Sequence, residues 1–166
     1  MAKIKVYVHA ITLDPESNSP ILILKEEGGD RTLPIWIGLL EATAIATEME
    51  KIGFARPMTH DLAVNLLKAL GVRIPKIEIS DLKDNTYYAL ITLEQNGETY
   101  EVDARPSDAV AIALRADAEI FVDEGVIEKT APTKTAEFVQ ASEAKDKDKW
   151  LEILENLDAD SVKYKM

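Results

Sequence analysis

The chain has 166 residues, of which 46% are apolar and 30% are charged, and its net charge is −11 at pH 7. This length and balance are typical of one folded domain with its own core, and they exclude collagen-like and disordered chains. The absence of cysteine excludes disulfide scaffolds, thiolate metal sites and cysteine nucleophiles.

Charge and apolar runs restrict the partners of the chain. A net charge of −11 disfavours loose binding to nucleic acid, because phosphate contacts need Lys and Arg. Residues 51–76, however, contain five Lys or Arg against one Asp, so this window is +4 and the rest of the chain is −15. No run approaches the roughly 18 apolar residues of a membrane span, and the first residues lack the apolar stretch of a signal peptide. We therefore expect a cytoplasmic protein with no membrane partner.

Three strands are predicted at the N-terminal end. Residues 3–13 alternate between apolar and polar side chains, which is the period of a half-buried strand. A second strand at 20–25 is apolar on both faces, which favours a position inside the sheet. A third strand at 32–37 contains Pro34, which has no backbone donor and indicates a sheet edge or a local bulge. Together they predict an antiparallel meander.

Two helices are predicted next. Residues 39–52 repeat apolar side chains at helical spacing, and this helix ends at Gly53. Thr59 is a natural N-cap for a second helix that ends at Gly71. The leucines of the second helix are Leu62, Leu66, Leu67 and Leu70.

Two further strands are predicted after the helices, at 72–79 and 85–94, and Asn96-Gly97 after them is the strongest hairpin signal in the chain. If these two residues form the turn of a hairpin, Gln95 faces Glu98. Counting outward from this turn puts Asp103 opposite Leu90. One face of the hairpin is predicted to be ordinary core surface. It carries Tyr87, Ala89, Ile91, Leu93, Tyr100 and Val102.

The last predicted elements are an Ala-rich helix at 106–116, a short strand at 120–122 and a charged helix at 144–157. The fold class that follows is α+β, with an antiparallel or mixed sheet of about six to seven strands, three core helices and a C-terminal helix. We expect one domain at 1–128 and a C-terminal extension at 129–166 that packs on it or on a neighbouring subunit.

The first polar segment gathers Arg56, Thr59, His60 and Asp61 at the start of the second helix. Free backbone N–H groups at a helix start favour anions, so a phosphate would fit there. Histidine is the only side-chain type that titrates near neutral pH unassisted, and a nearby carboxylate could hold His60 ready for proton transfer. The alternative is structural, with Thr59 capping the helix and His60 on the surface.

The second polar segment contains Asp103, Arg105, Ser107 and Asp108, between a strand end and a helix start. Two carboxylates and an arginine could hold Mg²⁺ or Mn²⁺, or bind a phosphate. In the structural alternative, Ser107 or Asp108 caps the helix and Asp103 pairs with Arg105. Glu41, in the first turn of its helix, is either a dipole partner or a further metal ligand.

Four segments in this order resemble the bifunctional nuclease family. They are Leu33-Pro34-Ile35-Trp36-Ile37-Gly38 with Glu41-Ala42, Arg56-Pro57-Met58-Thr59-His60-Asp61, Leu82-Lys83-Asp84-Asn85-Thr86-Tyr87-Tyr88-Ala89, and Asp103-Ala104-Arg105-Pro106-Ser107-Asp108-Ala109. The resemblance implies a compact α+β fold that forms oligomers and, as reported for some members, cleavage of both DNA and RNA. The polar positions of the family's motif match Glu41, His60, Asp61, Asp103, Arg105 and Asp108.

Roles for these residues follow from their chemistry. Asp103 and Asp108, with Glu41, are predicted to hold Mg²⁺ or Mn²⁺, while His60, beside Asp61, moves a proton. Substrate contacts are predicted for Arg56, Thr59, Arg105 and Ser107.

Two functions remain open on the sequence. One is a nuclease that binds nucleic acid, and the alternative is a non-catalytic oligomeric domain that binds or regulates an unidentified ligand. We expect a homo-oligomer, with a dimer favoured. The nuclease reading requires that the start of the second helix meet the loop after the Asn-Gly hairpin, around one bound anion.

Overall fold

Seven strands and four helices make up residues 2–130, the part of the chain that the computed structural model describes. The strands are β1 (Lys3–Leu13), β2 (Pro20–Glu26), β3 (Thr32–Trp36), β4 (Arg73–Lys83), β5 (Thr86–Gln95), β6 (Glu98–Ala104) and β7 (Glu119–Asp123). The helices are α1 (Leu39–Met49), α2 (Thr59–Ala69), α3 (Pro106–Ala116) and α4 (Glu124–Lys129). This confirms the α+β class with three core helices, while the predicted helix at 144–157 lies outside the described residues. No helix within 2–130 combines the length and apolar character needed to cross a membrane.

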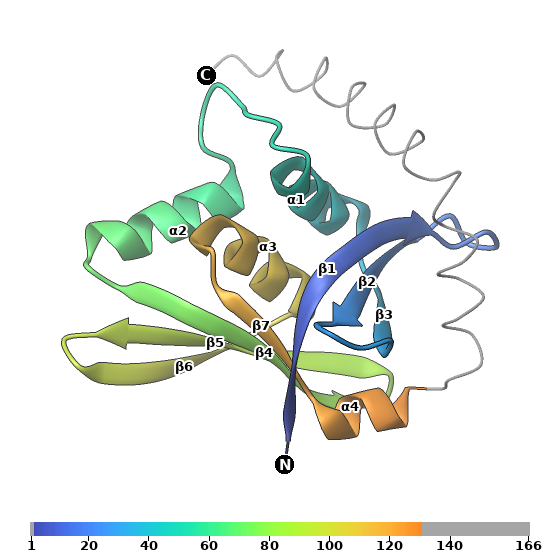
Figure 1. Cartoon of the computed structure of the whole chain (residues 1–166). Helices are drawn as coiled ribbons and strands as arrows, with labels where there is room; N and C mark the ends of the chain where they lie inside the picture. Colours follow the sequence, from blue (N-terminus) through green and yellow to red (C-terminus); the bar gives the residue numbers. More distant parts are fainter. Residues whose placement is uncertain (1, 131–166) are drawn as a thin grey trace.

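All seven strands form one sheet in the order β3-β2-β1-β7-β4-β5-β6. Neighbours are antiparallel except β4 and β7, which run parallel. The predicted N-terminal meander is confirmed, and Pro34 lies in the edge strand β3, where a missing donor is tolerated. Strand β7 joins this meander to the β4-β5-β6 meander (Figure 1).

The hairpin register is the predicted one. Asn96 and Gly97 both have positive φ, 51° and 78°, as a two-residue turn of the primed type requires. Gln95 pairs with Glu98, and Leu90 faces Asp103. The turn chemistry therefore fixes where the polar end of β6 emerges, immediately before α3.

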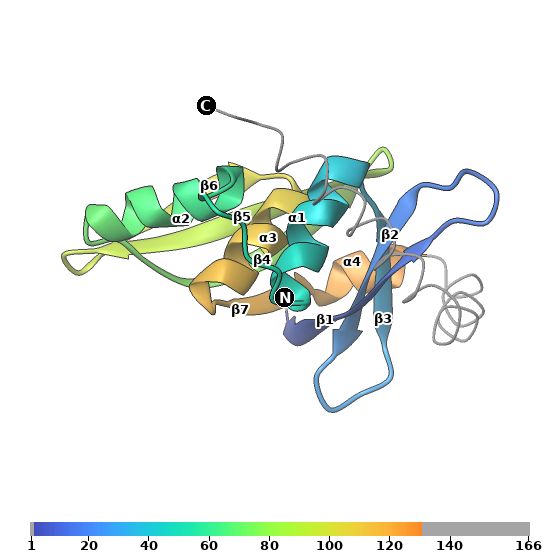
Figure 2. The same ribbon diagram turned by 90° about the horizontal axis from the view of Figure 1, so that it is seen from above.

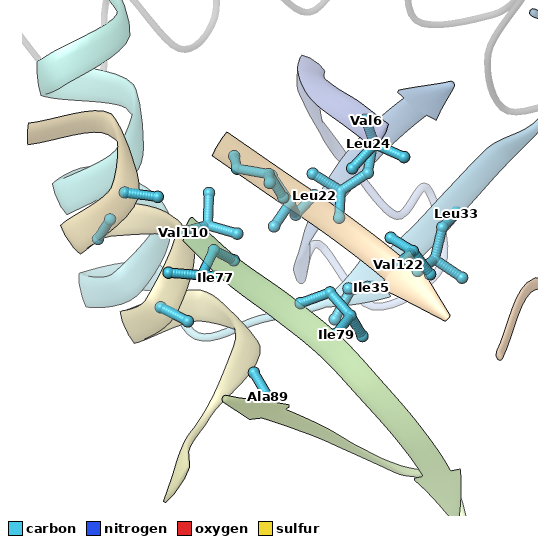
Figure 3. Packing of buried hydrophobic residues seen from close by; sticks show 14 of the residues in the cluster. Val6, Leu22, Leu24, Leu33, Ile35, Ile77, Ile79, Ala89, Val110 and Val122 are labelled. Atoms are coloured by element: carbon cyan, nitrogen blue, oxygen red, sulfur yellow. The ribbon is translucent and has the colours of Figure 1, made fainter. Parts of the chain in front are cut away.

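Three helices lie on one side of the sheet, with α1 and α2 both packed against α3 (Figures 1 and 2). Helix α3 contacts β4, β5 and β7, and its Val110 lies beside Ile77 of β4 in the core (Figure 3). Small buried residues such as Ala109 and Ala113 let this helix approach the sheet and its neighbours closely. Each fully buried Ile or Val contributes about 1.5–3 kcal/mol of transfer free energy. The first turn of α3 is thereby held between α1 and α2.

One expectation about buried surface, that for β6, is wrong, and α2 buries only part of its apolar surface. On α2, Val64 is buried and Leu67 packs on the core, whereas three other leucines are 50–68% exposed. On β6, Tyr100 and Val102 are 47% and 42% exposed, because β6 lies at the sheet edge beyond the strands that α3 contacts. The exposed leucines of α2 are Leu62, Leu66 and Leu70.

Helix α4 was not predicted, because six residues are too few to show a helical period. The carboxylate of Asp123 accepts a hydrogen bond of 2.9 Å from the N–H of Gly125, which starts the helix. Val126 is 1% exposed and fixes the helix against β4 and β7. Tertiary packing, rather than helical propensity, therefore stabilises this segment.

Candidate functional site

His60 and Asp108 meet although they lie 48 positions apart. The Nε2 atom of His60 is 2.9 Å from Oδ1 of Asp108, and the two side chains are 17% and 29% exposed. His60 lies in the first turn of α2 and Asp108 in the first turn of α3. The predicted meeting of the second helix start with the loop after the hairpin is therefore present, and the contact is partly open to solvent.

Arg105 connects this pair to a third helix. Its Nε donates to Oδ2 of Asp108 at 2.7 Å, and its Nη1 donates to Oε1 of Glu41 at 3.0 Å. Helices α1, α2 and α3 thus contribute their first turns to one chain of contacts, from Glu41 through Arg105 and Asp108 to His60, which we call the four-residue network. The Arg105 side chain is 64% exposed, so the network reaches the surface.

The network holds Asp108 in its ionised form. Burial alone would raise the pKa of Asp108, but hydrogen bonds from Arg105 and His60 outweigh burial and lower that pKa below its ordinary value. The Asp108 carboxylate in turn raises the pKa of Arg105, with a further contribution from Glu41. An ionised Asp108 accepts the hydrogen bond from Nε2–H of His60. The other ring nitrogen, Nδ1, is then the one that can accept a proton from a ligand.

A second ion pair lies beside the network. Arg115, 7% exposed, donates from Nε to Oδ1 of Asp61 at 2.7 Å and from its two other nitrogens to the carbonyls of Ala111 and Ala44, both at 2.9 Å. Oδ2 of Asp61 accepts from the N–H of Met58 at 2.9 Å. Burial would raise the pKa of Asp61, yet these donors lower it. Asp61 therefore positions the start of α2.

Sequence reasoning missed Arg115. A lone arginine near the end of an Ala-rich helix carries no local motif, and nothing in the chain places it near Asp61, 54 positions earlier. The one available signal was a cation inside an otherwise apolar helical run, since buried Arg residues are usually paired.

The structure does not bring Asp103 into the network. Asp103 is exposed on β6 and, within residues 2–130, forms neither a hydrogen bond nor an ion pair through its side chain. The alternative pairing of Asp103 with Arg105 is therefore wrong. Among the described residues, no group of three His, Asp or Glu side chains is placed to hold a metal ion. Since Glu41 and Asp108 both bind Arg105, their present arrangement does not fit the predicted Mg²⁺ or Mn²⁺ site.

The predicted capping roles are also wrong. The N-cap position of α2 is Met58 rather than Thr59, and that of α3 is Arg105 rather than Ser107 or Asp108. Thr59 is exposed as the first helical residue, where it can contact a ligand. Ser107 is 6% exposed and offers little surface to a substrate.

A cavity of about 300 Å³ opens beside the Asp61–Arg115 pair. Arg56 lines it from the connector between α1 and α2, is exposed, and has no side-chain partner among the described residues. The volume lies at the lower end of small-ligand sites. The lining residues are Thr47, Glu48, Ile52, Gly53, Phe54, Ala55, Arg56, Pro57, Asp61, Asn65 and Arg115.

The fold and the network define an α+β domain that gathers a histidine, an arginine and carboxylates at the first turns of three helices. The bifunctional nuclease domain model matches residues 22–134, and the chain belongs to this family. This confirms the resemblance carried by the four sequence segments.

Relatives from bacteria and plants share this domain. An uncharacterized protein of Mycobacterium tuberculosis is 39% identical over 163 residues, which cover 96% of this chain and 98% of the relative. Bifunctional nuclease 1 of Oryza sativa is 23% identical over 78% of this chain and 42% of its own length. Bifunctional nuclease 1 of Arabidopsis thaliana is 27% identical over 63% and 33%. The chain therefore spans less than half the length of these two plant relatives.

Proposed function

We propose that the protein is a nuclease that hydrolyses phosphodiester bonds at the four-residue network. The observation that carries the proposal is the 2.9 Å contact of His60 with Asp108, on which Arg105 also donates. It unites a proton acceptor, an anchoring carboxylate and a cation at one partly exposed position. The family name and the plant relatives named bifunctional nuclease support this class of reaction.

His60 acts as the general base in this proposal. Asp108 fixes the ring through Nε2 and stabilises the imidazolium that forms when Nδ1 takes a proton from the attacking water. Such positioned proton transfer contributes about 10²- to 10⁴-fold in rate. Asp108 stays ionised in this step, because hydrogen bonds from Arg105 and His60 outweigh burial and lower its pKa.

Arg105 and Arg56 bind the anionic substrate. Arg105 uses Nε and Nη1 within the network, which leaves Nη2 for an oxygen of the scissile phosphate. Arg56 receives a neighbouring phosphate at the cavity. The chain has a net charge of −11, so these two arginines attract nucleic acid at the site itself, while the chain as a whole does not.

A direct test measures cleavage of single- and double-stranded DNA and RNA by purified protein, with and without Mg²⁺ or Mn²⁺. His60→Ala and Asp108→Asn should each lower the rate about 100-fold or more. His9→Ala and Asp84→Asn are matched controls, since both residues lie outside the network and Asp84 occupies a positive-φ turn that Asn tolerates. Folded His60→Ala protein that cleaves as fast as the wild type would disprove the proposal.

The second candidate is a non-catalytic binding or regulatory domain. It is favoured by the engagement of Glu41, Arg105 and Asp108 with one another, which stabilises the helix starts without any substrate. On this view the network variants lose stability, and no preparation shows cleavage above the His60→Ala background. Nucleic-acid binding without turnover would then assign the domain to recognition.

A further inference from the structure

The cavity beside the Asp61–Arg115 pair has a charged lining that is largely compensated. Two arginines and two carboxylates line it, so the lining is formally neutral. Arg115 and Asp61 are engaged with each other at 2.7 Å, and Glu48 pairs with Lys51 at 3.7 Å. Arg56 is exposed and has no ion-pair partner within residues 2–130. The cavity therefore offers one available cation beside a wall that would not attract a second anionic group.

The remaining wall of the cavity combines an aromatic ring with a side-chain amide. The connector between α1 and α2, a loop in Figure 1, supplies Phe54 and Ile52, which are half-buried. Asn65 lies one turn beyond Asp61 on α2, is exposed, and forms no side-chain hydrogen bond among the described residues. Aromatic rings stack on unpaired bases, and an Asn amide can pair with the edge of a base. Both kinds of contact that hold an unstacked base are therefore present.

The cavity adjoins the four-residue network. Asp61 lines the cavity and directly follows His60 in the first turn of α2. On α1, Glu41 belongs to the network and Thr47 lines the cavity, and the helical rise between these two residues is about 9 Å. Neighbouring nucleotides of one strand can therefore contact the network and the cavity at the same time.

We propose that this cavity binds the base of one unstacked nucleotide, next to the phosphate that is cleaved. The choice of ligand rests on the proposed nuclease function, in which Arg56 binds the phosphate of the same nucleotide. A volume of about 300 Å³ is at the lower end of small-ligand sites, so it admits one base and not a base pair. A base inside a duplex must leave the stack before it can enter a cavity. The preferred substrate class is therefore single-stranded nucleic acid.

Mononucleotides test the base site without cleavage, because they contain no phosphodiester bond. In calorimetric titrations of the full-length chain, adenosine 5′-monophosphate (AMP) should bind about 10-fold or more tightly than ribose 5-phosphate, which lacks the base. Phe54→Leu should remove this preference, since leucine keeps apolar bulk without a stacking ring. Arg56→Ala should weaken both ligands alike. Phe121→Leu is the matched control, because Phe121 is half-buried on β7 and does not line the cavity.

A second variant guards against loss of the fold. Asn65 is exposed, so Asn65→Ala should unfold at the wild-type temperature and weaken AMP but not ribose 5-phosphate. Equal affinity of the wild type for AMP, ribose 5-phosphate and inorganic phosphate would overturn the proposal, and so would the absence of binding. A preference for AMP that survives in folded Phe54→Leu and Asn65→Ala proteins would also overturn it.

A second arm separates a nucleic-acid strand from a free nucleotide. With His60→Ala protein, to prevent turnover, a short single strand of DNA or RNA should bind about 10-fold more tightly than AMP and than the same strand in a duplex. Tighter binding of AMP or of the duplex would contradict the assignment to a strand. Base preference without cleavage of any nucleic acid would refute the proposed nuclease and keep the base site, whereas cleavage without base preference would do the reverse.

Discussion

At the scale of single residues, Arg105 decides the geometry of the candidate site. It is the N-cap residue of α3, and it donates to Asp108 on its own helix and to Glu41 on α1. A lysine could not donate to both carboxylates from one planar group. Arg105 therefore orients Asp108, and Asp108 orients His60. Arg105 need not transfer a proton itself to affect the reaction.

Gly38→Ala should disturb this geometry with little effect on the fold. A methyl group at Gly38 would lie 2.1 Å from Oε2 of Glu41, so the carboxylate must move away from its present position. The φ of Gly38 is −76°, which alanine adopts freely. Loss of one charge-assisted hydrogen bond to Arg105 corresponds to about a tenfold fall in kcat/KM.

Nuclease assays and thermal unfolding of Gly38→Ala check this expectation. Glu41→Gln is the comparison variant, since it removes the charge at the same position. Wild-type turnover in both variants would show that the contact of Glu41 with Arg105 has no part in the reaction.

At the scale of elements, α3 contributes one residue to the four-residue network and another to the ion pair with Asp61. Its first turn presents Asp108 to the network, and its last turn presents Arg115 to Asp61 and to a carbonyl of α1. Three helices are thereby locked by polar contacts at the two ends of one Ala-rich helix. The Asp61–Arg115 pair supports the site directly, because Asp61 follows His60 in the first turn of α2.

Arg115→Ala should destabilise the protein by about 3 kcal/mol. Breaking a buried pair commonly costs 3–5 kcal/mol, and the value here is expected at the low end because the Asp61 side chain is 32% exposed. Urea unfolding measures the loss. Arg115→Lys should recover part of it, and a loss below about 1 kcal/mol would contradict the structural role assigned to the pair.

Local signals explain which elements could be predicted. Three of these signals act within a few residues. The alternation of apolar and polar side chains predicts the strands, Asn96-Gly97 predicts the hairpin register, and Pro106 predicts the start of α3. The apolar content of α2 could not reveal which face is buried, because both Val64 and the exposed leucines satisfy a helical period. Helix α4 depends on packing alone.

At the scale of the whole molecule, the candidate site depends on contacts that no local pattern contains. The meeting of His60 with the loop after the hairpin was a requirement of the nuclease hypothesis, whereas the pairing of Arg115 with Asp61 was not predicted at all. The same limit applies to the sheet, since the central position of β7 and its parallel pairing with β4 are non-local. The catalytic roles of these residues remain predictions.

Acid should destabilise the fold through Asp61 and Asp108. Both have a folded-state pKa below the ordinary value of 3.8, so the unfolded chain binds protons that the folded chain does not as pH falls. Their contribution is therefore complete above the ordinary pKa and is lost as pH falls through the lowered values. The measurement is urea unfolding between about pH 6 and pH 2. Below roughly pH 4, the free energy of unfolding should fall more steeply with pH for the wild type than for Asp61→Asn or Asp108→Asn. Equal slopes would contradict this linkage.

The central position of β7 has a consequence for how the chain acquires its structure. Residues 119–123 separate two three-stranded units, β1-β2-β3 and β4-β5-β6, that share no direct strand pairing with each other within the described sheet. During synthesis, each unit can form its hairpins early, yet the two cannot join into one sheet until the ribosome has released β7. A nascent chain stopped at residue 118 would therefore hold two half-sheets with open edges, and the final few residues of the domain convert them into one.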